Sequence, residues 1–87
     1  MYEIRTTNKY EKSFEGLDKP IQEQILKKIE DLKTSPVSIP PMRYMPLSLK
    51  GLRKCRTGDW RIFYFVKDTI VTLYDVDKRD TAYRDLS

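Results

Sequence analysis

Three short runs rich in β-branched and aromatic residues, between Leu49 and Tyr83, constrain the fold of this chain more than any other feature. Each run has the length of a short strand, and turn-forming residues separate the runs. A Thr57-Gly58-Asp59 turn follows the first run, and Lys67-Asp68 follows the second. Runs joined by such short turns predict antiparallel hairpins. We therefore expect a meander of three strands, at residues 52–57, 60–66 and 69–76.

The amino-terminal part of the chain carries the signals of one strand and two helices. The segment YEIRTT alternates enough to be a strand of the same sheet. Asn8, followed three residues later by Glu11, resembles a capping box and predicts a short helix that stops at Gly16. Asp18 is a favourable N-cap for a second, longer helix, whose apolar residues recur at helical spacing as far as Ser35. One apolar stripe on each helix predicts a helical hairpin packed on one face of the sheet.

A proline-rich segment connects the helices to the meander. Residues 35–48 hold four of the five prolines, which excludes a helix interior and favours an extended loop. We expect four apolar side chains to pin this loop to the core: Met42, Tyr44, Met45 and Leu47. The length of 87 residues predicts a single domain spanning residues 1–87. The expected fold class is α+β: a four-stranded, mainly antiparallel twisted sheet with an N-terminal helical hairpin packed on one face and an open, basic, concave face opposite.

Positive charge is concentrated in the middle of the sequence. Between Arg43 and Arg61 six cations accompany one acidic residue, Asp59, whereas the whole chain has a net charge of +4. Such a segment attracts polyanions and makes their binding dependent on salt. An ordinary solvated face is the alternative interpretation. The six cations are Arg43, Lys50, Arg53, Lys54, Arg56 and Arg61.

Composition limits the chemistry that the chain can carry. The sequence has no histidine, and its one cysteine, Cys55, can neither pair within the chain nor build a thiolate metal site. We therefore expect no metal and no small-molecule cofactor, and we predict that Cys55 is a buried small apolar side chain. The chain has neither an apolar run of the roughly 20 residues that span a bilayer nor a secretory signal. We expect a protein of the cytoplasm with no membrane partner.

Arg61 lies within a run that is otherwise almost wholly β-branched or aromatic. A buried strand tolerates a charge only with a partner, so Arg61 needs an anionic group. A structural carboxylate, Asp75 or Asp77, is one candidate, and an anionic ligand is the other. Arg79 and Tyr83 follow the last predicted strand, and we expect them to converge with Arg61 at its end.

The order of strand, helix, helix, long loop and three strands resembles the RelE/ParE superfamily of small toxins from toxin–antitoxin modules, along essentially the whole chain. Arg79 lies four residues before Tyr83, as in that family's pattern, and Lys78 stands where many members have histidine. The resemblance implies a RelE-like toxin domain opposed by a cognate antitoxin protein. For RelE-like members it implies ribosome-dependent cleavage of translated mRNA, and for ParE-like members binding to DNA gyrase. The most specific part of the resemblance is the spacing of Leu52, Arg56, Gly58, Asp59, Trp60 and Arg61.

The resemblance also implies roles for individual residues. Arg61 matches the strand arginine that contacts the scissile phosphate, and Arg79 matches the arginine after the last strand. Tyr83 matches the C-terminal tyrosine of the RNA-cleaving branch, and Lys54 and Arg56 match the basic strand that binds the mRNA backbone. We therefore predict a catalytic set of Arg61, Arg79 and Tyr83, and an RNA-binding set of Lys50, Arg53, Lys54, Arg56, Trp60 and Lys78.

These residue types suit the cleavage of RNA without a metal. The adjacent 2'-OH attacks the phosphorus, so the protein must help to remove one proton, stabilise charge on the phosphoryl oxygens and protonate the leaving 5'-oxygen. Arginine suits the second task because its planar fork stays charged, and a tyrosine among arginines is a credible acid or base. The alternatives are that Tyr83 only packs, and that the chain is a ParE-like gyrase binder or an inactive member that acts as a binding module.

Overall fold

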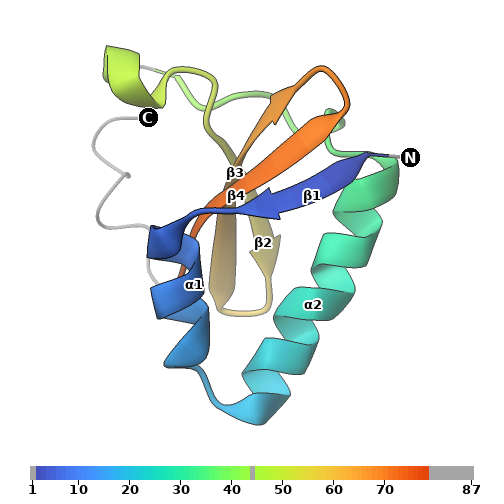
Figure 1. The fold of residues 1–87 in the computed structure, drawn as a ribbon, viewed down its shortest axis with the longest axis vertical. Helices are drawn as coiled ribbons and strands as arrows, with labels where there is room; N and C mark the ends of the chain where they lie inside the picture. Colours follow the sequence, from blue (N-terminus) through green and yellow to red (C-terminus); the bar gives the residue numbers. More distant parts are fainter. Residues whose placement is uncertain (1, 44, 79–87) are drawn as a thin grey trace.

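The computed structural model describes residues 2–43 and 45–78, which form a layer of helices packed on a β-sheet (Figure 1). The α+β class and the predicted order of elements are confirmed, with a short 3-10 helix added in the connecting loop. No helix within the described residues is long and apolar enough to cross a membrane. In chain order the elements are β1 (Glu3–Thr6), α1 (Asn8–Glu15), α2 (Lys19–Thr34), η1 (Leu47–Leu49), β2 (Arg53–Thr57), β3 (Trp60–Lys67) and β4 (Ile70–Asp77).

The four strands form one mixed sheet in the order β1-β4-β3-β2. Strands β2, β3 and β4 pair antiparallel, whereas β1 runs parallel to β4 at the edge of the sheet. Two-residue turns, Gly58-Asp59 and Asp68-Thr69, close the two hairpins. Their first residues have φ angles of 62° and 55°, which suits the twist of a tight hairpin. The second turn lies one residue later than predicted, because Lys67 still pairs with Ile70 and belongs to β3.

Both helices pack on one face of the sheet, here called the helix side, as predicted (Figure 1). Alternate residues of the strands point to this face and meet the apolar stripes of α1 and α2. Ile25 of α2 and Ile62 and Tyr64 of β3 have no exposed surface. The predicted burial of Cys55 is confirmed as well. The other buried members of this core are Tyr10, Ile29, Leu32, Val71, Leu73 and Val76.

The opposite face, here called the loop side, is partly covered, which corrects the expectation of an open face. Leu52 and Phe63 are fully buried there. Apolar surface left in water costs about 25 cal/mol per Å², and the connecting loop removes this cost by folding over the sheet. The predicted anchor Tyr44 lies outside the described residues. The loop side chains that pack here are Met42 and Met45, as predicted, together with Leu49.

Leu47 does not anchor the loop. It lies in η1 and is 88% exposed, so its predicted contact with the core is wrong. Hydrogen bonds secure the loop at other points: Met42 N donates to Leu52 O over 2.8 Å, and the Tyr64 hydroxyl donates to Pro36 O over 2.8 Å. These bonds satisfy backbone groups that burial would otherwise leave without a partner.

Thr7, and not Asn8, caps helix α1. Thr7 has an extended backbone, and its hydroxyl accepts a hydrogen bond from Tyr10 N over 3.1 Å. Glu11 accepts from the Thr6 hydroxyl over 2.7 Å. The predicted capping box is therefore wrong by one residue. The physical reason is that Thr7 N still donates to a carbonyl of β4 over 3.1 Å, which holds the residue in the extended conformation that an N-cap needs.

Candidate functional site

Arg61 lies on the loop side of the sheet, beside the turn between β2 and β3. Ile62 and Tyr64 enter the helix-side core, so the neighbouring positions, Arg61 and Phe63, point the opposite way. The Arg61 side chain is half-buried at this position. The pleat of β3 therefore lets a charged residue stand within an apolar strand without entering the core.

Two backbone carbonyls orient the guanidinium of Arg61. Its Nη1 atom donates to Asp59 O over 2.8 Å and to Lys78 O over 3.0 Å. The first carbonyl belongs to the hairpin turn, and the second to the residue that follows β4. These bonds fix one corner of a planar donor fork, and a fixed fork loses less freedom when it binds an anion.

Arg56 and Lys54 of β2 lie on the same side of the sheet as Arg61. Arg56 is directly opposite Arg61 across the β2–β3 pair, and Lys54 is opposite Phe63. Like charges directly opposite each other destabilise a sheet. This pairing therefore concentrates positive charge at a cost in stability. We call Lys54, Arg56 and Arg61 the cationic row.

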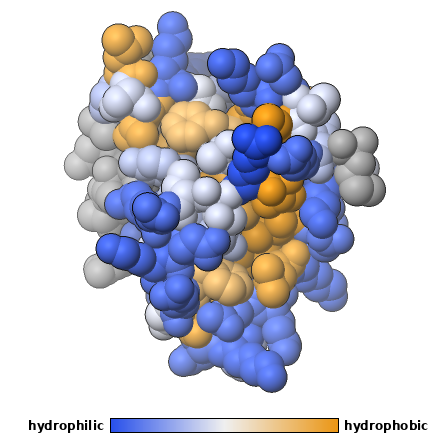
Figure 2. All heavy atoms as spheres, viewed as in Figure 1, coloured by the Kyte–Doolittle hydropathy of each residue, from blue (hydrophilic) through white to orange (hydrophobic). Residues whose placement is uncertain are grey.

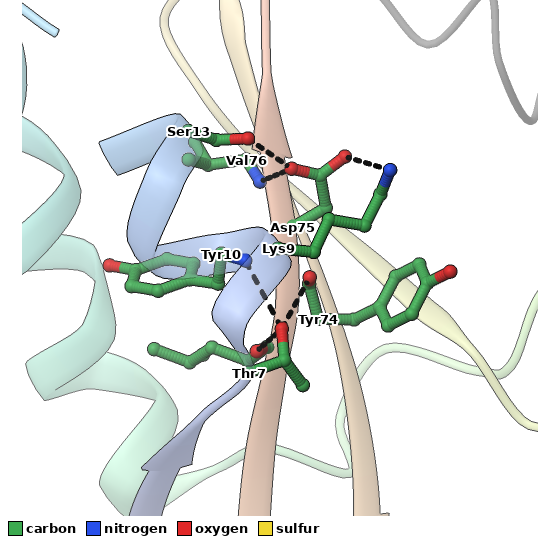
Figure 3. Close-up of polar contacts among 8 residues, drawn as sticks. Thr7, Lys9, Tyr10, Ser13, Tyr74, Asp75 and Val76 are labelled. Atoms are coloured by element: carbon green, nitrogen blue, oxygen red, sulfur yellow. Dashed lines mark hydrogen bonds and ion pairs between the residues drawn. The ribbon is translucent and has the colours of Figure 1, made fainter. Parts of the chain in front are cut away.

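Two residues of β4 that pair with β3 near the cationic row carry carboxylates. One of them, Asp75, binds α1 (Figure 3). Asp75 is 6% exposed, and its Oδ1 accepts from Ser13 Oγ over 2.7 Å and from Val76 N over 2.8 Å. Lys9 Nζ lies 3.9 Å from Oδ2. These partners compensate for the burial of the charge and join α1 to the end of β4. The other carboxylate residue, Asp77, is the register partner of Arg61.

The structure separates two predicted RNA-binding residues from the cationic row. Arg53 and Trp60 are on the helix side, because they share the alternation of Cys55 and Ile62. The Arg53 Nη1 atom donates to the Ile39 carbonyl, which ties the connecting loop to β2. Trp60 is half-buried and packs against the helix-side core.

Two further predicted residues, Lys50 and Lys78, lie just after the elements η1 and β4. Both are exposed. Through its carbonyl, Lys78 also orients Arg61. Arg79 and Tyr83 lie outside the described residues, so their predicted convergence with Arg61 stays a prediction.

Gln24 of α2 contacts the site from the opposite side of the sheet, and sequence analysis missed it. Its Nε2 atom donates to Thr57 O over 2.7 Å, at the end of β2. In the sequence Gln24 falls among the charged and polar residues of the outer face of α2. No local pattern distinguishes a glutamine that reaches a strand from one that faces water.

The buried thiol of Cys55 has no features of a nucleophile or a metal ligand. Burial raises its pKa, an effect that Lys28 opposes and Asp31 reinforces. A thiol held protonated in this way is unreactive at neutral pH. No group of metal-ligating side chains occurs within residues 2–43 and 45–78. The chemistry of the described site therefore belongs to its arginines, lysines and carboxylates.

A second feature is an apolar groove where α1, α2 and β1 meet, away from the cationic row. It has a volume of about 570 Å³, and Figure 2 shows apolar surface gathered between the two helices with hydrophilic residues around it. Leu26 of α2 is 52% exposed and adjoins the other apolar side chains of the groove, so the exposed apolar surface is contiguous. The apolar residues that line the groove are Ile4, Tyr10, Phe14, Leu26, Ile29 and Leu73.

Comparisons with solved structures support the fold. The chain is similar to the RelBE toxin–antitoxin complex of Mycobacterium tuberculosis, with 27% identity, a TM-score of 0.77 and coverage of 90% of this chain and 98% of that chain. It is similar to the isolated RelE toxin of E. coli, with 25% identity, a TM-score of 0.74 and coverage of 98% and 94%. The chromosomal ParDE system of P. aeruginosa shares the fold, with 14% identity, a TM-score of 0.65 and coverage of 88% and 95%.

Sequence comparison assigns the family. No curated protein sequence matches the chain significantly. Residues 4–83, however, match the family described as the ParE toxin of the type II toxin–antitoxin system parDE. That match covers nearly the whole chain, and the solved RelE structures share its arrangement of strands and helices. This chain therefore belongs to the ParE toxin family of type II toxin–antitoxin systems, within the RelE/ParE superfamily.

Proposed function

We propose that this toxin is a RelE-like endoribonuclease, which cleaves translated mRNA on the ribosome and so inhibits translation. The observation that carries the proposal is Arg61, a half-buried arginine whose guanidinium two backbone carbonyls orient beside Arg56 and Lys54. A fixed donor fork in a row of cations suits the recognition of a phosphate whose negative charge increases during reaction. The similarity to the isolated RelE toxin of E. coli supports the same reading.

The proposed reaction needs only acid–base and electrostatic catalysis. The 2'-oxygen forms a bond to phosphorus, the bond from phosphorus to the 5'-oxygen breaks, one proton leaves the 2'-OH and another reaches the 5'-oxygen. Arg61 and Arg79 stabilise the charge on the phosphoryl oxygens, and Tyr83 transfers a proton. Lys54 and Arg56 hold the message backbone, with Lys50 and Lys78 beside them. In the absence of histidine, the ribosome supplies the orientation of the substrate that the toxin alone lacks.

The second candidate function is that of a gyrase-binding toxin. The match of residues 4–83 to the ParE family favours it. In that case the cationic row is part of a protein-binding surface, and no step of RNA cleavage depends on Arg61. The two functions differ in one observable, the appearance of new mRNA ends on translating ribosomes.

The partner we propose is a cognate antitoxin, with an amphipathic segment that occupies the groove between α1, α2 and β1. The solved RelBE structure of M. tuberculosis is a toxin–antitoxin complex, and its toxin shares this fold. The groove is lined mainly by apolar side chains and continues to β1, which is one of the two edge strands of the sheet. An apolar groove next to a sheet edge suits a segment that folds on binding, because it offers both apolar contacts and backbone hydrogen bonds.

The proposed nuclease function is tested by single-turnover cleavage of ribosome-bound mRNA at saturating toxin. Arg61→Ala and Arg79→Ala should each lower the rate by about 10²–10³, the usual cost of losing a donor to a charged transition state. Tyr83→Phe keeps the ring and removes the hydroxyl, so it should lower the rate by roughly 10²–10⁴. Ribosome binding should persist in all three variants.

Arg5→Ala is the matched control, because Arg5 is an exposed strand arginine on β1 that pairs with Glu3 over 2.6 Å. It should cleave at the rate of the wild type. Full-rate cleavage by the Arg61, Arg79 and Tyr83 variants would refute the proposed site. If the wild type produces no new mRNA ends, inhibition of gyrase becomes the function to measure.

A further inference from the structure

A side chain of the helical layer, Gln24 of α2, contacts the turn between β2 and β3. Gln24 Nε2 donates to Thr57 O over 2.7 Å and lies 3.3 Å from Thr57 Oγ1. Gly58, the first residue of the turn, is packed against the same amide, because a Cβ atom at Gly58 would lie 2.6 Å from Gln24 Nε2. Glycine suits this position for two reasons, since it leaves room for the Gln24 amide and adopts a φ of 62° without strain.

This turn also supports Arg61 through a backbone carbonyl. The turn has only two residues between the paired positions Thr57 and Trp60. Thr57 O and Asp59 O are therefore only two peptide units apart, so a contact that holds Thr57 O and Gly58 also restricts the Asp59 carbonyl. That carbonyl accepts the hydrogen bond from Arg61 Nη1 over 2.8 Å. A continuous path of short contacts thus leads from α2, through the turn, to the guanidinium on the loop side.

We propose that Gln24 is a positioning residue for Arg61: it holds the β2–β3 turn so that Asp59 O keeps the guanidinium in the orientation that binds phosphate. This inference rests on the proposed nuclease function for its catalytic consequence, but not for its structural content. Positioning groups behind a site can change activity strongly although they never touch the substrate, because small displacements of a donor are costly.

Two variants of Gln24 separate loss of the contact from loss of bulk. Gln24→Ala removes the amide and enlarges the polar hollow of about 220 Å³ that lies beside Gln24 and Thr57. Gln24→Glu keeps the shape of the side chain, but its carboxylate cannot donate to Thr57 O and is repelled by that carbonyl. Both variants should disturb Arg61, the second without opening a cavity.

Gln22 supplies the matched control on the same helix. Its Nε2 atom donates to the Phe14 carbonyl over 2.9 Å, and both glutamines are half-buried. Gln22→Ala therefore removes the same kind of side chain and the same kind of hydrogen bond, but its contact leads to the end of α1 and not to the turn. A general loss of stability should appear in both alanine variants, whereas an effect on Arg61 should appear only at Gln24.

The first measurement is the nuclear magnetic resonance spectrum of the Arg61 side chain in the free full-length toxin. Hydrogen bonds at Nη1 slow rotation of the guanidinium, so the wild type should show resolved Nη signals for Arg61. In Gln24→Ala and Gln24→Glu these signals should merge through faster rotation, and in Gln22→Ala they should keep their wild-type form. Unchanged Arg61 signals in both Gln24 variants, or the same change in Gln22→Ala, would overturn the proposal.

The second measurement is single-turnover cleavage at saturating toxin, combined with Arg61→Ala in a double-mutant cycle. Gln24→Glu should lower the rate by about tenfold or more, and it should have no further effect when Arg61 is already alanine. Additive losses would show that Gln24 acts independently of Arg61 and would contradict the inference. If the wild type does not cleave RNA, the nuclease proposal fails, while the spectrum of Arg61 still decides the role of Gln24.

Discussion

Tyr10 and Tyr64 are phenols buried in the helix-side core, with 3% and 0% of their surface exposed. Burial, assisted by Glu11 at Tyr10, raises the pKa of each to about 12. At Tyr64 the neighbouring Cys55 also raises the pKa, and Arg53 opposes the change. The folded protein therefore holds both phenols neutral at a pH where the unfolded chain, with an ordinary pKa of about 10, begins to release their protons.

Alkaline unfolding tests this property of Tyr10. Between pH 10 and 12 the unfolded state binds fewer protons than the folded state, so the stabilisation present below pH 10 is lost as the pH rises. Each phenol should contribute a slope of up to about 1.4 kcal/mol per pH unit in the free energy of unfolding. Tyr10→Phe should remove the contribution of Tyr10, measured by urea unfolding at pH 9, 10 and 11. Equal slopes for the variant and the wild type would show that the Tyr10 phenol does not resist ionisation.

Helix α1 is held to β4 by side chains at both of its ends. Thr7 caps the helix and its Oγ1 also donates to Tyr74 O over 2.8 Å, while Ser13 donates to Asp75 over 2.7 Å (Figure 3). Such contacts fix where the helix begins and which face it turns to the sheet. They also explain why an eight-residue helix, too short to be stable alone, is formed here.

Substitution at the start of α1 distinguishes the observed cap from the one that the sequence predicts. Thr7→Ala should lower the free energy of unfolding by about 1–2 kcal/mol, because it removes the cap and the bond to Tyr74. Asn8→Ala, at the exposed first residue of the helix, should change it by less than about 0.5 kcal/mol. Thermal or urea unfolding measures both. A larger loss in Asn8→Ala would mean that Asn8 caps the helix in solution.

The molecule presents two separate surfaces, the apolar groove and the cationic row. Tyr10 and Leu73 of the groove belong to the helix-side core, whereas Arg56 and Arg61 lie on the loop side. The sheet therefore stands between the proposed site of the antitoxin segment and the proposed site of RNA. Substitutions in one surface should leave the other intact, since distant sites usually act additively.

A charge placed in the groove tests the proposed antitoxin site. Leu26→Glu should weaken antitoxin binding by about tenfold or more, because complex formation would bury an unpaired carboxylate. The folded toxin should keep its stability, since Leu26 is already 52% exposed. Leu47→Glu is the control, because Leu47 is exposed and lies in η1, outside the groove. Calorimetric titration with the antitoxin measures both, and equal affinities for the two variants would place the antitoxin elsewhere.

Much of this architecture follows from local sequence patterns. β-branched and aromatic runs separated by turn residues predict β2, β3 and β4 to within a residue or two, because strand and hairpin signals act over a few neighbouring positions. The apolar spacing of α2 likewise predicts a helix from Lys19 to Thr34. Arg61 is predicted as a site residue from the sequence alone, since a charge within an apolar strand needs an anionic partner.

Other features depend on which surfaces meet after folding. Lys54 and Arg53 are adjacent in a basic run, yet the alternation of side chains along β2 places them on opposite faces of the sheet. Lys54 lies on the loop side, and Arg53 lies on the helix side, where it donates to the Ile39 carbonyl. The loop covers Phe63 because burial of that ring lowers the free energy of the folded state. The sequence of residues 35–48 does not predict which face of the sheet the loop covers. Gln24 reaches Thr57, 33 positions away, only because α2 packs across β2. Local periodicity specifies the elements, but the partner of each side chain is set by long-range burial, which acts between residues distant in the chain.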